Sequence, residues 1–249
     1  MSELGKSCRA ALLAVVLAPA IVVSAACGSS QTEENNASSS SRAAVPPQNL
    51  GPTASSGTPG APPPPAPPAD APRPHSYTIA DLIKDNNLAE EALRPGNPGA
   101  PTIDLPVPPG WTDAGGQTPS WAWNAVYLPD ASMSADPPNV ITLVNKLTGR
   151  GSEHAFSYAL GEVANLNNFQ GDAPRPMQIS GFNAWQQGGT FTREDGVERA
   201  IVQTTVAIPA PGGGVVIMQS NADAPRDQLQ LITDVATARN AATTIAPPV

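Results

Sequence analysis

The residue types that most often carry covalent catalysis are scarce in this chain. It has 249 residues and 2 histidines, of which His154 lies in the globular part, two positions after Ser152. A serine hydrolase needs a histidine base beside its nucleophile and a third group that orients the base. The G-x-S-x-G turn that exposes a nucleophilic serine is absent. We therefore expect no enzyme, and an esterase that uses Ser152 and His154 is the less favoured alternative.

Metal or phosphate chemistry is not indicated either. Cysteine and histidine do not cluster, and the acidic residues lack the spacing of a calcium-binding loop. The glycines 212–214 are not followed by Lys and Ser or Thr, so they predict a turn rather than a phosphate-binding loop. A pair of catalytic carboxylates stays open as an alternative, because nothing singles out two of them. We expect no metal and no cofactor.

The tryptophans are better candidates for a binding site. All 4 lie between Trp111 and Trp185. Trp121 and Trp123 are two positions apart, so on a strand they would point to the same face. Aromatic rings beside amide side chains such as Asn124 suit a carbohydrate or glycolipid. Packing in the core is the alternative for Trp121 and Trp123, and it is favoured for Trp185.

The N-terminus predicts export and lipid anchoring. Lys6 and Arg9 precede an apolar run over residues 10–26, which has the form of a secretory signal. The run ends in Ser-Ala-Ala-Cys27-Gly, as in a bacterial lipobox, although Leu is more usual than Ser24 three residues before the cysteine. We expect residues 1–26 to be a lipoprotein signal peptide and Cys27 to carry the lipid. An ordinary cleavage site is the alternative. Two acyl chains on the cysteine suffice for stable attachment to a membrane.

A spacer separates this anchor from the rest of the chain. Residues 27–75 are rich in Ser, Asn and Pro, with twelve prolines between positions 45 and 74. Such a composition cannot bury enough apolar surface to offset the entropy of ordering, so we expect a disordered tether. Residues 76–249 then form a single globular domain. The formal net charge of −8, with no basic stripe, argues against nucleic acid as a partner.

Hydrophobic spacing in this domain predicts a mixed fold. Thr78 and Asp81 form a capping box for a helix that reaches about residue 86. Further helices are expected at 152–166 and at 225–241, the last with Pro225 in its first turn. Strands are expected at 102–107, 123–128, 140–147, 177–179, 183–192, 197–208 and 215–220. Consecutive strands with few helices indicate the α+β class, with an antiparallel sheet flanked by helices.

Several segments of the domain resemble a known family. They are Tyr77–Asp81, Gly99–Pro108, Trp111, Lys146–Gly149, Asn168–Gly171, Gly181–Gln186 and Gln219–Asp223. In this order and with the lipobox and spacer, they resemble the LpqN/LpqT family of mycobacterial envelope lipoproteins. The resemblance covers the whole domain, although the stretch 118–123 does not match the family pattern.

The resemblance implies an α/β/α sandwich similar to that of the PsbP proteins. It also implies an accessory protein that handles trehalose mycolates or other envelope lipids, with envelope lipid transporters or mycolyltransferases as partners. We therefore expect a membrane-anchored glycolipid-binding protein. Trp121, Trp123, Asn221 and Asp223 are the residues that we expect at the mouth of its ligand site. A protein-interaction scaffold without a ligand is the alternative.

Overall fold

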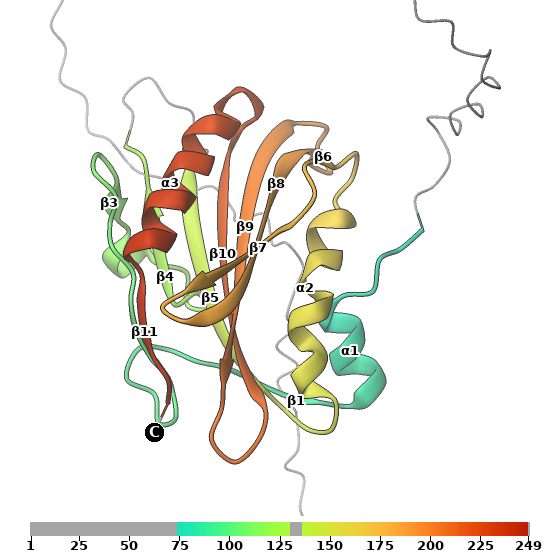
Figure 1. Cartoon of the computed structure of the whole chain (residues 1–249). Coiled ribbons are helices and arrows are strands. Elements are labelled where there is room, and N and C mark those ends of the chain that lie inside the picture. The colour runs from blue at the N-terminus through green and yellow to red at the C-terminus, as the bar shows by residue number, and fades with distance from the viewer. Residues whose placement is uncertain (1–73, 130–135, 249) are drawn as a thin grey trace, which may run out of the picture. The chain divides into compact units, whose positions relative to one another are not determined.

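The computed structural model describes residues 74–129 and 136–248 (Figure 1). The signal peptide, Cys27 and nearly all of the spacer lie outside these residues. In the described part, no helix is both long and apolar enough to cross a membrane.

A large antiparallel sheet forms the centre of the domain. Its strands follow the order β3-β4-β5-β10-β9-β8-β6, while β1 pairs with β5 and β7 pairs with β8. Their bounds are β1 Ala89–Ala92, β3 Thr112–Asp113, β4 Asn124–Tyr127, β5 Asn139–Thr148, β6 Gln170–Gly171, β7 Arg175–Ile179, β8 Phe182–Thr192, β9 Glu198–Pro209 and β10 Val215–Pro225. The short strands β2 (Thr102–Asp104) and β11 (Thr244–Ala246) pair separately.

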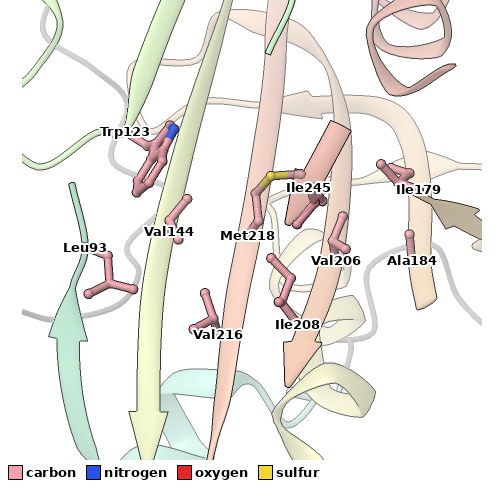
Figure 2. Packing of buried hydrophobic residues seen from close by; sticks show 10 residues of the cluster. All are labelled: Leu93, Trp123, Val144, Ile179, Ala184, Val206, Ile208, Val216, Met218 and Ile245. Carbon is pink, nitrogen blue, oxygen red and sulfur yellow. The ribbon is translucent and has the colours of Figure 1, made fainter. Parts of the chain in front are cut away.

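Helix α3 (Leu229–Ala242) and strand β11 cover one face of the sheet, here called the α3 side (Figure 1). Side chains alternate between the two faces of a strand. On β10, Val216 and Met218 therefore point to the α3 side, into a buried cluster that includes Ile245 of β11 (Figure 2). A second cluster, which includes Ala222, packs beneath Ile232 of α3.

Helices α1 (Ile79–Asn86) and α2 (Ala155–Ala164) pack on the opposite face, here called the α2 side. Ile217 of β10 points to this side and lies in one cluster with Ile79 and Ala159. The residues just before α1 approach α2 closely: a Cβ on Gly161 would lie 2.1 Å from the Tyr77 carbonyl oxygen. Only glycine permits this approach, which ties the beginning of the domain to α2.

The α+β class and the antiparallel sheet are confirmed, and the capping box of Thr78 and Asp81 is present. The final helix differs from the prediction. Pro225 ends β10, since it pairs with Arg199 of β9, and α3 begins only at Leu229 after a short 3-10 turn. Strand β2 stops at Asp104 rather than at residue 107. The likeness to PsbP proteins stays a prediction.

Four short strands were not predicted from the sequence. They are β1, β3, β6 and β11, of two to four residues each. Segments of this length are too short to show a periodic pattern. Three of them pair with the free edge of a longer strand, as β1 does with the second half of β5, whereas β11 pairs with the equally short β2.

Candidate functional site

The structure brings three of the four predicted binding residues to the α2 side. Asn221 and Asp223 are alternate residues of β10, so their side chains point to the same face. The cross-strand partner of Asn221 on β5 is Ile141. Ile141 belongs to a small buried cluster with Ala114, Ala122 and Ala125, and the half-buried Trp121 packs against this cluster.

Trp123 lies elsewhere, and the expectation that the two tryptophans share a face of a strand is wrong. Strand β4 begins only at Asn124, after a turn that contains Trp121. The backbone N–H of Trp123 donates to the Thr142 carbonyl at 2.7 Å. Its indole is 8% exposed and packs in the α3-side cluster with Val144 (Figure 2). A ligand-binding role of Trp123 stays a prediction, but the geometry gives this residue a packing role.

The other tryptophans also have packing partners. Trp111 is buried beneath α3. Trp185 is half-buried on the α2 side and stacks on Phe156 of α2, with 6.0 Å between the ring centroids. For Trp185 this agrees with the favoured interpretation.

Asn221, which is half-buried, belongs to a group of polar side chains whose other members are buried. We call it the α2-side polar cluster, and it consists of Glu162, Gln203, Thr205, Gln219 and Asn221. Gln203 donates from Nε2 to Asn221 Oδ1 at 3.0 Å, and Gln219 donates from Nε2 to Glu162 Oε2 at 2.6 Å. Gln219 is 2% exposed and Glu162 is 4% exposed. A helix thus places a carboxyl group directly over the middle of the sheet.

Burial of this carboxyl group changes its acidity. Desolvation raises the pKa of Glu162 to about 7, against the lowering effect of the hydrogen bond from Gln219. Oε1 of Glu162 has no hydrogen-bond partner among the described residues. Near neutral pH the group therefore exists in both forms, as a hydrogen-bond donor when protonated and as an acceptor only when ionised.

An ion-pair network surrounds Asp223, which follows Asn221 on the same face of β10. Arg199 contacts Asp223 and also lies 3.3 Å from Asp136, whose carboxylate is 2.6 Å from Arg193. Arg199 is almost fully buried, while the carboxylate of Asp223 is about one quarter exposed. Desolvation raises the pKa of Asp223, and the hydrogen bond from Arg199 opposes that rise. Asp223 is therefore held in place and presents part of its carboxylate to solvent.

This arrangement suits a ligand with many hydroxyl groups. Amide side chains both donate and accept hydrogen bonds, and a carboxylate accepts them from hydroxyl groups. A half-buried indole at the margin offers an apolar face. Gln203, Gln219 and Glu162 were not predicted from the sequence as site residues. The strands carried a signal: Gln203–Thr205 and Gln219–Asn221 are runs of three polar residues within apolar strands, and the first and third of each run point to one face.

The residues of the alternative esterase are not joined into a catalytic pair. Ser152 is 1% exposed, while the side chain of His154 is 64% exposed on the same short turn. The only carboxylate near the His154 ring in the described part is Glu153, at 3.6 Å. Within residues 74–129 and 136–248, no three His, Cys, Asp or Glu side chains are grouped as a metal site would require.

Comparisons with known proteins agree on one family. The family model described as "Probable lipoprotein LpqN" matches residues 75–246. Lipoprotein LpqN of Mycobacterium tuberculosis (strain ATCC 25618 / H37Rv) is 38% identical over 174 residues, which are 69% of this chain and 75% of that protein. A crystal structure of LpqN, described as involved in cell envelope biogenesis of Mycobacterium tuberculosis, matches with a TM-score of 0.64 and 38% identity. The match covers 69% of this chain and 99% of the crystallised one.

Proposed function

The chain belongs to the family of the LpqN lipoproteins, and we propose on this basis that it is a lipid-anchored protein of the cell envelope that binds a glycolipid. Cys27 would carry the anchor, and residues 27–75 would act as the tether. The domain would hold the sugar headgroup of a trehalose mycolate-like lipid and assist its transport or use in biosynthesis. Envelope lipid transporters or mycolyltransferases are the proposed partners.

One observation carries the proposal. Asn221 and Asp223 share one face of β10, Gln203 of β9 bonds to Asn221, and Trp121, from a distant part of the sequence, packs against the cluster that contains Ile141, the cross-strand partner of Asn221. Binding sites for small molecules typically combine apolar walls with a few fixed polar groups. Here Ile141 and Trp121 supply the apolar part, and the amides and Asp223 supply the polar part.

The test uses residues 74–249. The crystallised relative is matched over 99% of its length by 69% of this chain, so the domain alone is sufficient for folding in that relative. Native mass spectrometry and calorimetry with a short-chain trehalose ester should show one bound ligand per domain. Asn221→Ala and Trp121→Ala should each weaken binding by about threefold to tenfold, as expected for one hydrogen bond or one stacking contact.

Asn183→Ala is the matched control, because Asn183 is an exposed amide on β8 that lies outside the cluster. It should leave the affinity unchanged. Absence of any bound ester would refute the glycolipid proposal and favour the scaffold without a ligand, for which chemical cross-linking would then identify partners. Release of the free acid from the ester would instead support the alternative of an esterase.

A further inference from the structure

The α3 side contains a buried cation without an acidic partner. Arg239 of α3 is 3% exposed. Its Nε donates to the Pro106 carbonyl at 3.1 Å, and its Nη2 donates to Asn124 Oδ1. Nη1 has no hydrogen-bond partner, and no carboxylate lies within ion-pair distance of the guanidinium in the described part of the chain. The nearest acidic influence is Asp113, which bonds to Nδ2 of Asn124 at 3.1 Å.

Burial of a guanidinium without a counter-charge lowers the stability of the folded domain unless other interactions compensate for the lost hydration. Desolvation lowers the pKa of Arg239 to about 10, so the group is still protonated at neutral pH. A buried charge normally has a counter-charge and a full set of hydrogen bonds. Glu162 on the opposite side of the sheet can escape this cost by taking up a proton, but a guanidinium cannot become neutral under the same conditions.

Arg239 lies at one end of a row of polar side chains, which we call the α3-side polar row. It contains one residue per strand in cross-strand register: Asn124, Thr142, Ser220, Thr204 and Gln186. Thr142 and Ser220 bond to each other at 2.8 Å, and Asn240 of α3 donates to Thr204 at 3.1 Å. The row separates the two apolar clusters of this side, since Met218 belongs to one and Ala222 to the other.

The segment that contacts the guanidinium has few strand pairs, although Leu105 packs against the α3-side cluster and Pro108 is buried. Between β2 and Trp111 it contains Pro106, Pro108 and Pro109, and its Val107 is 43% exposed. Strand β2 holds it through only three pairs with β11.

We propose that Arg239 is the anchor of a second binding site, which takes an anionic oxygen group such as a carboxylate or a phosphate beneath the segment 105–110. The group would accept hydrogen bonds from the unpaired Nη1 and from its neighbour Nη2, in the two-point geometry that arginine offers to such anions. The amide of Asn124 would flank it. This site lies on the opposite face from the site proposed for the sugar, so each can exist without the other.

Calorimetric titration of residues 74–249 tests the proposal with three probes at equal ionic strength: sodium octanoate, sodium phosphate and octanol. Saturable binding of octanoate but not octanol would identify an anionic amphiphile as the ligand class. Saturable binding of phosphate alone would identify a free phosphate group. Chloride at the same ionic strength gives the baseline. No saturable binding of either anion, or equal binding of octanol and octanoate, would overturn the proposal.

Substitution then assigns the site. Arg239→Gln should weaken binding of the anion by about 10-fold to 100-fold, as expected for a charge-assisted hydrogen bond. Arg226→Gln is the matched control, since Arg226 is an exposed arginine that pairs with Glu198, and it should bind normally. Should Arg239→Gln fail to fold, Arg239→Lys keeps the charge but loses the two-point geometry, and its affinity should lie clearly below that of the unchanged protein. Unchanged affinity in a folded Arg239 variant would refute the assignment.

Discussion

On each side of the sheet, a helix buries an ionisable side chain against polar residues of the strands. The two side chains differ in charge and in their surroundings. On the α2 side, Glu162 bonds to Gln219 in a cluster that also contains the half-buried Asn221. On the α3 side, Arg239 meets Asn124 and a row that lies between two apolar clusters. Polar residues of the α2 side, such as Asn221, reach the surface, whereas most residues of the α3-side polar row are buried.

The difference shows how burial selects chemistry. A carboxyl group that loses water can remain in place as a neutral acid, so Glu162 needs no cation. Arginine has no such option at neutral pH, so the α3 side retains a positive charge that its own described residues do not pair. The α2 side is thus suited to neutral hydroxyl groups, and the α3 side to an anion.

The largest expected effect is a difference in stability loss between a tryptophan of the α3 side and one of the α2 side. Trp123→Ala should lower the free energy of unfolding by about 3–5 kcal/mol, because it leaves a cavity in the α3-side cluster. Trp121→Ala should cost less than half as much, since this indole is half-exposed and has fewer buried neighbours. Urea unfolding of residues 74–249 measures both. Equal losses would mean that the two sides do not differ in this way.

The next effect concerns Glu162 and the pH dependence of stability. Its pKa in the folded domain is about 7, above the ordinary value of 4.5, so the folded state binds the proton more tightly than the unfolded state. Stability from this group is therefore fully present below about pH 4.5 and is lost as the pH rises toward 7. The loss is about 3 kcal/mol at most.

Glu162→Gln should remove this slope, and it should leave the protein at least as stable as the unchanged one at pH 8. Urea unfolding between pH 4.5 and pH 8 is the measurement, in a range set by the two pKa values. Glu153→Gln is the control, because Glu153 is exposed and should leave the slope intact. If the slope survived in Glu162→Gln, burial of this carboxyl group would not be its cause.

The smallest expected effect on stability concerns the α3-side polar row. Thr142 and Ser220 satisfy each other through one hydrogen bond of 2.8 Å in a fully buried setting. Ser220→Ala should cost about 1–2 kcal/mol, because it leaves the Thr142 hydroxyl unpaired. Ser220→Ala combined with Thr142→Val should cost less than the sum of the single changes, since no unpaired group then remains. Additive losses in this cycle would show that the row is hydrated or loosely packed.

Much of the fold could be predicted because its elements are long and periodic. Strands β5 and β9 carry runs of β-branched and apolar residues, and the positions of β5, β8 and β9 agree with the predictions within about two residues. Strand β10 was expected to end at Ser220 but continues to Pro225, although Asn221 and Asp223 are polar. Pairing on both edges, with β5 and with β9, overrides the low strand propensity of these residues.

The candidate site was predictable only in part. Trp121 was named from its spacing to Trp123 and from nearby amides, and Asn221 and Asp223 lie in a segment that resembles the family, but nothing in the sequence says that Ile141 would be the cross-strand partner of Asn221. The placement of Trp123 depended on where β4 begins, a boundary of one residue that propensity does not determine. Glu162 and Arg239 look like ordinary surface residues of amphipathic helices until the sheet is in place.

The sequence by itself determined the family, the mixed α+β class, the capping box of the first helix and the expected lipid anchor at Cys27, since each depends on residues that are neighbours along the chain. Only the tertiary structure decided which polar residues are buried and which faces they share. Strand register brings together residues that lie far apart in the sequence, and helix packing decides whether a charged side chain faces water or the sheet. For that reason, Glu162 on the α2 side and Arg239 on the α3 side could be recognised as buried ionisable groups only in the folded domain.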